Sequence, residues 1–421
     1  MMKTMLFSLS LFLLTIFVSS FISRQSYALE ENVVPDSYIV VFKDDVASPA
    51  SVASEMARQH GLSLAFVYSH ALKGFSATIP AARLNALKKD PRVQFISEDR
   101  VVNINGQANG KGKPTPTPVL QPPEEIPTGI LRIGTAVNTG AGIGVAVIDT
   151  GIDLDHPDLI GNIVGNVSCV PRKSTGDDDN GHGTHVAGTI AAADNTIGVI
   201  GVAPQAQLYA VKVLNSRGSG TWSSVICGVD WVTARAATIK VANMSLGGGG
   251  SSDNNCGKDN SDALHKAICA SRDAGVTYVV AAGNESDNVA NHAPAADDDA
   301  VFTVSALGDS GGRSGGLGSA TNYGPDDTFA TFSNFGSVVD LGAPGVAIRS
   351  TWKNGGYNTI SGTSMATPHV AGAAALYLSA HPDASWTTIR DGLISAGEVL
   401  GSGHTDPSDL HPEKVVLTGS L

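Results

Sequence analysis

Two histidines, His182 and His185, lie three positions apart in the stretch DDDNGHGTHVAGT at residues 177–189. Histidine has the unperturbed pKa closest to neutral, so the pair could bind a metal, supply a general base, or pack in the core. A zinc-binding pair would need i, i+4 spacing with an intervening glutamate, and neither is present. We interpret His182 as the base, because the start of a helix keeps an imidazole neutral, and His185 as a packed core residue.

Two other polar side chains follow predicted strands. Asp149 ends the apolar strand 143–149, where a buried carboxylate needs a partner such as a protonated histidine. An aspartate that caps the next turn is the alternative. Asn284 follows the strand 277–283 and could donate a hydrogen bond to a developing oxyanion, although an asparagine in a tight turn is the simpler interpretation.

Ser364 stands at the start of a predicted helix within residues 360–380, which is so rich in alanine and glycine that it must be tightly buried. Its hydroxyl and backbone N–H then face the helix N-terminus, where negative charge is favoured. Pro368 is tolerated in the first turn. A serine hydroxyl is a weak nucleophile unless a base takes its proton, and His182 is the natural base. We interpret His369 as structural.

The elements that must position these residues begin at about residue 126. Apolar, β-rich runs alternate there with helices built of small residues. Continuous apolar strands between helices predict a parallel sheet covered on both faces, with ligand sites at the carboxyl ends of the strands. The glycine-rich stretch 140–144 precedes a strand rather than following one, so it is not a dinucleotide-binding loop.

Residues 36–103 form a separate small unit. Their strand and helix patterns follow the order βαββαβ, which predicts a ferredoxin-like α+β arrangement. The stretch 103–125 is dominated by Gly, Pro, Asn and Thr, and it predicts an exposed linker of the kind that proteases cut.

The composition limits the function classes. The chain has 421 residues, 42% of them apolar, and a formal net charge of −12, which suits a globular protein and argues against nucleic acid as a partner. Lys3, the apolar run 6–22 and small residues up to Ala28 are typical of a secretory signal cut after Ala28; an uncleaved membrane anchor is the alternative. No later stretch is long enough to span a bilayer.

Export also suits the four cysteines, an even number in an oxidising setting. They allow three pairings. Cys256 with Cys269 closes a short loop, which leaves Cys169 with Cys227. Free buried thiols are the alternative.

Together the motifs VIDTGID, NGHGTHVAGT, SLGGGG, AAGNES and GTSMATPHVAGAAAL carry a resemblance. The chain resembles the secreted, subtilisin-like serine peptidases over nearly all of residues 124–400, with their chain order Asp, His, Ser. Residues 36–103 resemble the propeptide of that family, which is a folding chaperone and temporary inhibitor. The implied domains are a signal peptide at 1–28, a propeptide at 29–103, a linker with the maturation site at 104–123 and a subtilisin-like catalytic domain at 124–421.

The resemblance implies an endopeptidase that acts on proteins and peptides. Ser364 would attack the peptide carbonyl, His182 would transfer the proton, Asp149 would orient the imidazole, and Asn284 would hold the oxyanion with the Ser364 N–H. Two backbone edges would pair with an extended substrate; their residues are Gly218, Ser219, Gly220, Ser245, Leu246 and Gly247. Residues 291–295 would close the pocket that holds the substrate residue before the scissile bond. A catalytically silent binding protein and a serine esterase are the alternative functions, and a monomer without membrane contact after signal removal is expected.

Calcium is implied in the same way, because hard oxygen ligands in an acidic protein suit this ion. The expected ligands are side chains and carbonyls of Glu124, Asp158, Ala193, Asn195, Ile197 and Val199; an ordinary Asn/Gly turn is the alternative. The aspartates 177–179 would form a solvated loop or hold a second ion, and residues 297–299 would lie at the surface. Loop 308–327 is longer than its family counterpart. Its role is left open between a mobile segment, an ion site and a substrate contact.

Overall fold

The N-terminal unit is an antiparallel sheet carrying two helices. The structure is a computed structural model that describes residues 33–104 and 121–421, so the expected signal peptide and most of the expected linker lie outside the described residues. The sheet order is β4, β1, β3, β2, as the βαββαβ pattern predicts. The elements are β1 (Val33–Phe42), α2 (Pro49–His60), β2 (Ser63–Tyr68), β3 (Gly74–Thr78), α3 (Ala81–Lys88) and β4 (Val93–Ile104).

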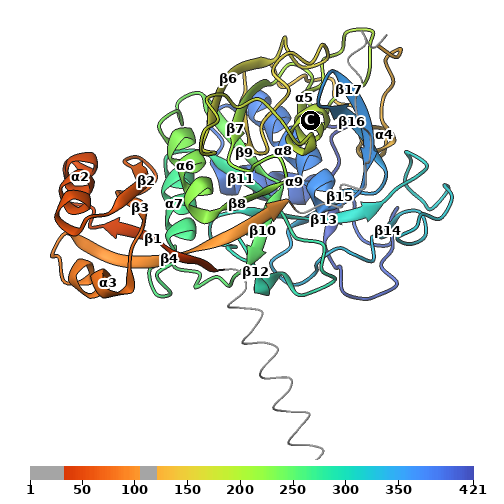
Figure 1. The fold of residues 1–421 in the computed structure, drawn as a ribbon. Coiled ribbons are helices and arrows are strands. Elements are labelled where there is room, and N and C mark those ends of the chain that lie inside the picture. The colour runs from red at the N-terminus through yellow and green to blue at the C-terminus, as the bar shows by residue number, and fades with distance from the viewer. Residues whose placement is uncertain (1–32, 105–120) are drawn as a thin grey trace, which may run out of the picture.

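The second unit is built on a long, mostly parallel sheet (Figure 1), and the predicted fold class is confirmed. Its order is β18, β15, β13, β11, β9, β5, β7, β6, with β14 antiparallel to β13. The strands are β5 (Gly144–Asp149), β6 (Ile163–Ser168), β7 (Gln207–Lys212), β9 (Ile239–Met244), β11 (Thr277–Ala281), β13 (Phe302–Gly308), β14 (Thr328–Phe329), β15 (Leu341–Pro344) and β18 (Lys414–Val415).

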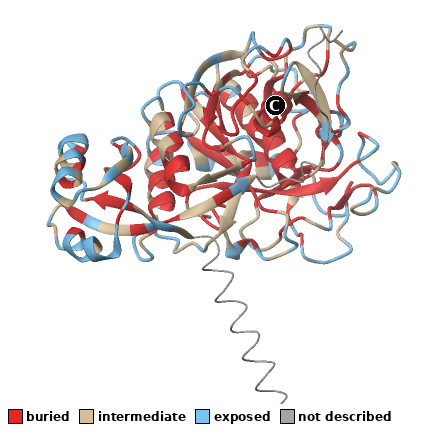
Figure 2. Ribbon diagram, viewed as in Figure 1, coloured by how far each residue is buried: buried red, intermediate tan, exposed pale blue. Residues whose placement is uncertain are grey.

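Helices cover both faces of this sheet, because successive side chains of a strand point to opposite faces. Val145 and Val147 of β5 pack in one cluster with α5 (His182–Ala191) and α8 (Thr363–Ala380). Ala146 and Ile148 pack in another with α6 (Trp222–Thr233) and α7 (Ala263–Asp273). Figure 2 shows these helices buried at the centre of the molecule. The remaining elements are α4 (Thr128–Ile133), α9 (Trp386–Ala396), the short helix Val289–Asn291, and strands β8 (Ser219–Thr221), β10 (Leu246–Gly249), β12 (His292–Ala293), β16 (Ile348–Trp352) and β17 (Gly356–Ile360).

The two units meet along β4 and at α6 (Figure 1). Strand β4 leaves the small sheet and continues into the second unit, where it pairs antiparallel with β8 and β10. The Asp99 carboxylate accepts hydrogen bonds from the Ser223 N–H (2.9 Å) and hydroxyl (2.6 Å) in the first turn of α6, where negative charge is favoured. At the other end of α6, Asp230 accepts backbone N–H groups of residues 69–71. The small unit is therefore docked by specific polar contacts as well as by β pairing.

Both expected disulfides are present, Cys169–Cys227 and Cys256–Cys269. The first joins the end of β6 to α6, and the second joins the loop before α7 to that helix. None of the helices in the described part of the chain is long and apolar enough to cross a membrane.

Candidate active site

Asp149 and His182 form a fully buried pair at the carboxyl end of β5. The His182 Nδ1 lies 2.9 Å from Asp149 Oδ1 and 3.0 Å from Oδ2. An ionised carboxylate can only accept, so Nδ1 carries the proton and Nε2 presents a lone pair. Among the described residues, Nε2 has no hydrogen-bond partner. The pair is thus oriented as a general base requires.

The approach of α5 to β5 depends on Gly183. A Cβ at this position would lie 2.1 Å from the Gly151 carbonyl oxygen, so only glycine lets the helix start this close to the strand end. The Gly183 N–H donates to the Thr150 hydroxyl (2.9 Å), and the fully buried Lys212 donates to the Thr150 carbonyl (2.5 Å). Lys212 was not identified from the sequence as part of the site. A lysine ending an otherwise apolar strand beside Asp149 was the available signal.

Among the aspartates 177–179, Asp177 is exposed, as expected of a solvated loop, whereas Asp178 is buried and Asp179 is half-buried. Asp178 is buried and accepts the N–H groups of Asn180, Gly181 and Thr184, which fixes the start of α5. Asp179 accepts from Lys212 (2.7 Å) and pairs with Lys173. Neighbouring groups therefore engage Asp178 and Asp179, and Asp178 lies against the start of the helix that begins at His182.

His185 and His369 are packed core residues, as expected. The His185 Nε2 lies 2.9 Å from the Ile348 carbonyl, and burial lowers its pKa to about 3. The His369 Nδ1 lies 2.8 Å from the Met365 carbonyl, and burial lowers its pKa to about 4. Both rings are therefore neutral at physiological pH, and each donates to a main-chain carbonyl.

Ser364 is held at the carboxyl end of β9, the neighbour of β5. Its hydroxyl donates to the Ser245 carbonyl (3.1 Å), and the Ser245 hydroxyl donates back to the Ser364 carbonyl (2.9 Å). Ser245 directly follows β9, so these two bonds fix the N-terminus of α8 over that strand end. The buried Ser245 side chain thereby supports Ser364, while its carbonyl belongs to the expected substrate edge.

Asn284 follows β11, the next strand of the sheet. Its side-chain oxygen accepts from the Thr363 N–H (2.9 Å) and hydroxyl (3.1 Å), so the NH₂ group is the donor that it can offer. The fully buried Asn334, which sequence reasoning missed, fixes the loop after Asn284 by accepting the Glu285 and Asp287 N–H groups. The carboxyl ends of β5, β9 and β11 thus present a histidine–aspartate pair, a serine and a carboxamide side by side.

The expected substrate edges are filled by the chain itself. Asn103 of β4 lies between Ser219 of β8 and Gly247 of β10, and Ile104 pairs with Leu246. The Ile104 N–H donates to the Gly218 carbonyl (3.0 Å). A cavity of about 310 Å³ adjoins this strand. It is lined partly by residues of the expected pocket segment, among them His292, Ala293 and Ala295.

The expected calcium residues also come together. Glu124 accepts the Asn195 N–H (2.6 Å), and the fully buried Asp158 accepts the Asn195 amide (2.9 Å) and the Val199 N–H (3.0 Å). Burial, with the Glu124 charge adding to it, raises the pKa of Asp158 to about 6. Two carboxylates and a carboxamide around one loop are a hard oxygen donor set, so these residues fit a calcium ion.

Comparison with known proteins agrees with this geometry. Residues 140–409 match the subtilase family and residues 37–105 match peptidase inhibitor I9. The chain is 37% identical to subtilisin E of Bacillus subtilis, over 95% of this chain and 94% of that protein. It is 38% identical to a cuticle-degrading protease of Metarhizium anisopliae, over 83% and 81%. An extracellular serine proteinase of a Thermus species is 36% identical, over 86% and 84%. A cold-adapted subtilisin-like serine proteinase of known structure superposes with a TM-score of 0.57 at 37% identity, over 70% of this chain and 98% of that one.

Proposed function

The chain belongs to the subtilase family of serine peptidases and carries an I9 inhibitor propeptide, and from this premise we propose that Asp149, His182, Ser364 and Asn284 perform its chemistry. The observation that carries the proposal is the buried His182–Asp149 pair, whose Nδ1 is engaged and whose Nε2 has no partner among the described residues. The packed histidines His185 and His369 also leave one ring nitrogen without a partner among the described residues, but their other nitrogen contacts a main-chain carbonyl. In His182 the other nitrogen contacts a buried carboxylate instead, which can stabilise the imidazolium that a general base becomes.

In the proposed mechanism the Ser364 hydroxyl attacks the peptide carbonyl while His182 Nε2 takes its proton. Asp149 holds the Nδ1 proton and stabilises the imidazolium that forms. The Asn284 NH₂ group and the Ser364 N–H hold the oxyanion. His182 then gives the proton to the leaving amine, and a water repeats the sequence to release the acyl group as an acid.

We propose that the domain boundaries follow the family plan, with a signal peptide at 1–28, propeptide at 29–103, linker at 104–123 and catalytic domain at 124–421. The pairing of β4 with β8 and β10 supports an inhibitory role, because the propeptide strand lies where an extended substrate would add as a strand. Substrate would replace this strand after self-cleavage in the segment that follows Ile104, and would contact Gly218, Ser219, Gly220, Ser245, Leu246 and Gly247.

The same plan extends to location and cofactor. We propose that the protein is secreted as a monomer that acts on proteins and peptides, as the extracellular relatives suggest, with no nucleic-acid or membrane partner after signal removal. We also propose a structural calcium ion held by side chains of Glu124, Asp158 and Asn195 with carbonyls of Ala193, Ile197 and Val199. Chelation should lower the melting temperature of the wild type more than that of Asp158→Asn; equal shifts would count against this site.

The test of the mechanism is the intact mass of the secreted protein, wild type beside Ser364→Ala, expressed with calcium. We expect the wild type to lose everything up to the linker and the variant to keep residues 36–103 attached. Ser361→Ala, three residues away, is the matched control and should mature normally. If Ser364→Ala is trimmed like the wild type, a foreign protease does the cutting and the nucleophile assignment loses its support. Casein hydrolysis by the wild type separates a peptidase from an esterase, and labelling of Ser364 by a serine-directed inhibitor separates both from a silent binding protein.

A further inference from the structure

Loop 308–327 carries three buried carboxylates that the proposed mechanism does not use. Asp309, Asp326 and Asp327 are 1%, 6% and 2% exposed, and one ligand oxygen from each lies within 4.8 Å of the others. The loop connects β13 to β14, at the far end of the molecule from the propeptide (Figure 1). Burying three carboxylates this close together is costly unless a cation or hydrogen-bond donors compensate for their charge.

Hydrogen-bond donors around the cluster compensate for only part of this negative charge. Asp326 accepts the Ser310 N–H (2.7 Å) and the Gly318 N–H (2.5 Å). Asp327 accepts the Gly316 N–H (2.9 Å) and the Arg132 guanidinium (2.5 Å).

Asp309 has the fewest hydrogen-bond donors of the three carboxylates. Its Oδ1 accepts the Gly312 N–H (2.9 Å), whereas its Oδ2 is buried and has no hydrogen-bond partner within residues 33–104 and 121–421. Of the six carboxylate oxygens in the cluster, it alone is left without a donor there.

The positive charge nearby is already shared. Arg132 is fully buried, and it binds Glu398 (2.6 Å) as well as Asp327. Glu398 also accepts from His404 (2.8 Å). One guanidinium therefore faces both a three-carboxylate cluster and a further glutamate, so the cluster keeps an excess of negative charge.

The loop is shaped around the cluster. Gly318 must be glycine, since a Cβ there would lie 2.3 Å from the Ser310 hydroxyl and 2.8 Å from the Asp326 carboxyl carbon. A cavity of about 330 Å³, lined by Asp326, Asp327 and residues 401–405, borders the cluster.

From this arrangement we propose that Asp309, Asp326 and Asp327 bind a calcium ion. Oxygens on opposite sides of a calcium ion lie about 5 Å apart, because each Ca–O distance is about 2.4 Å, and the cluster fits within that span. The ligands are all oxygens, which excludes the metals that prefer nitrogen or sulfur. Magnesium needs a tighter, near-ideal octahedron than a glycine-rich loop provides. The ion joins the two ends of this long loop, Asp309 and Asp326–Asp327, and the Asp327–Arg132 ion pair separately joins the loop to α4. The site is separate from the calcium site proposed at Asp158.

The experiment counts bound calcium in full-length Ser364→Ala, a background that prevents autolysis. Chelated protein is titrated with calcium and the stoichiometry is read by native mass spectrometry. We expect Asp309→Ala to bind one ion fewer than the parent, Asp158→Asn to lose a different ion, and the double variant to lose both. Asp383→Ala, which removes an exposed carboxylate elsewhere, is the matched control and should keep the full number.

An equal calcium count in Asp309→Ala and its parent would overturn the proposal, as would equally tight filling of the site by magnesium. If Asp309→Ala does not fold, as judged by circular dichroism, Asp309→Asn replaces it, since this change keeps the shape and removes one charge. Its affinity for the lost ion should be at least ~10-fold weaker than that of the parent, because ligand charge sets calcium affinity; an unchanged affinity would also overturn the site. None of these outcomes depends on peptidase activity, so the experiment tests the calcium site independently of the proposed roles of Asp149, His182 and Ser364.

Discussion

His182 and His265 are both fully buried and both hydrogen-bonded to an aspartate, yet they lie in sites with different capacities. The His182 Nδ1 contacts Asp149 at 2.9 Å and its Nε2 has no partner among the described residues. The His265 Nε2 contacts Asp299 at 2.6 Å, while its Nδ1 lies 3.3 Å from Asp253 and 3.4 Å from Asp297. Carboxylates face both ring nitrogens of His265, so neither offers a lone pair to a reacting hydroxyl.

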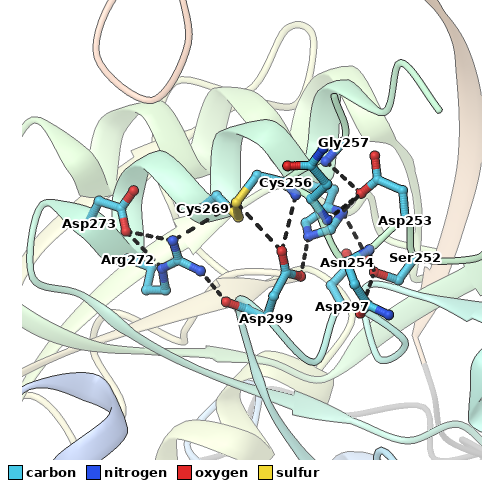
Figure 3. Close-up of a disulfide and its surroundings, with 12 residues drawn as sticks. Ser252, Asp253, Asn254, Cys256, Gly257, Cys269, Arg272, Asp273, Asp297 and Asp299 are labelled. Carbon is cyan, nitrogen blue, oxygen red and sulfur yellow. Dashed lines mark hydrogen bonds and ion pairs between the residues drawn. A yellow bond between two sulfur atoms is a disulfide. The ribbon is translucent and has the colours of Figure 1, made fainter. Parts of the chain in front are cut away.

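Figure 3 shows the Cys256–Cys269 disulfide with Asp253, Asp297 and Asp299 around it, the three aspartates that lie near the ring of His265. Asp253 accepts the N–H groups of Asn255, Gly257 and Asp259, and these bonds outweigh the effect of burial and lower its pKa to about 2. Asp299 accepts the Cys256 N–H beside the Cys256–Cys269 disulfide. The comparison shows that carboxylates lie near both ring nitrogens of His265 but near only one of His182, so Nε2 of His182 is the nitrogen that can accept a proton from a hydroxyl, as the proposed mechanism requires.

The largest difference between the two histidine sites should appear in kcat when the imidazole of His182 or of His265 is removed. His182→Ala should lower kcat by about 10⁶-fold, the order of magnitude found for the same loss in subtilisin itself, and should change the melting temperature little. Steady-state hydrolysis of a peptide substrate measures it. Adding Ser364→Ala should cost almost nothing more, because the two groups act as a unit. Additive losses would contradict that coupling.

His265→Ala should show the opposite pattern. Removing the ring takes away the hydrogen bond to Asp299 and the group that Asp253 and Asp297 face, so the free energy of unfolding should fall by about 3–5 kcal/mol. Denaturant titration measures this change. The kcat of the folded fraction should stay at the wild-type value, and a large drop in kcat would mean that the two histidine sites are not independent.

A smaller effect is expected from the oxyanion donor. Asn284→Ala should lower kcat by about 10²–10³-fold, a magnitude known from subtilisin, with KM nearly unchanged, because the donor acts on charge that develops in the transition state. Asn260→Ala, which changes an exposed asparagine outside the site, is the control and should leave kcat unaltered. A rise in KM at constant kcat would assign Asn284 to ground-state binding instead.

The smallest expected effect is a pH dependence of the free energy of unfolding that arises from Asp297, next to His265. Burial, together with Asp262, Asp299 and Asp253, raises the pKa of Asp297 well above its ordinary value. A raised folded-state pKa means that the folded chain holds this proton more tightly than the unfolded chain. The contribution to stability is therefore full below pH ~4 and is lost as the pH rises through the folded-state pKa.

Asp297→Asn stays neutral, so its stability relative to the wild type should rise with pH by about 1.4 kcal/mol per unit within that window. Chemical denaturation at several pH values measures the difference. A difference independent of pH would show that Asp297 does not titrate there. The expectation that residues 297–299 lie at the surface is wrong for Asp297, which is 2% exposed.

Much of the fold followed from pattern alone. Continuous apolar runs such as residues 143–148 predicted a parallel sheet with both faces covered, and β5 is buried along its whole length. The rule that parallel strands end at one edge then placed Asp149 and Asn284 there. Cysteine spacing gave both disulfides, because a short loop limits which residues can meet.

Other features depended on contacts that spacing does not encode. The sequence did not indicate that Asp178 would bond to Thr184 or Asp179 to Lys212, because these groups come within hydrogen-bond distance only in the folded chain. Asp297 follows an alanine-rich run without any signal that His265, 32 positions earlier, lies against it. The spacing in the glycine-rich loop 308–327 likewise did not indicate that its three aspartates would come together, with Arg132 paired to Asp327.

The sequence by itself determined the reactive groups and the strand and helix ends that carry them, because hydrophobic periodicity and residue type can be seen in a single stretch of sequence. The tertiary structure decided which buried carboxylate meets which cation. That depends on distances between residues far apart in the sequence, and electrostatic energy in a poorly screened interior changes steeply with those distances. His182 and His265 differ for this reason alone: packing left one ring nitrogen unpaired in the first and surrounded both with carboxylates in the second.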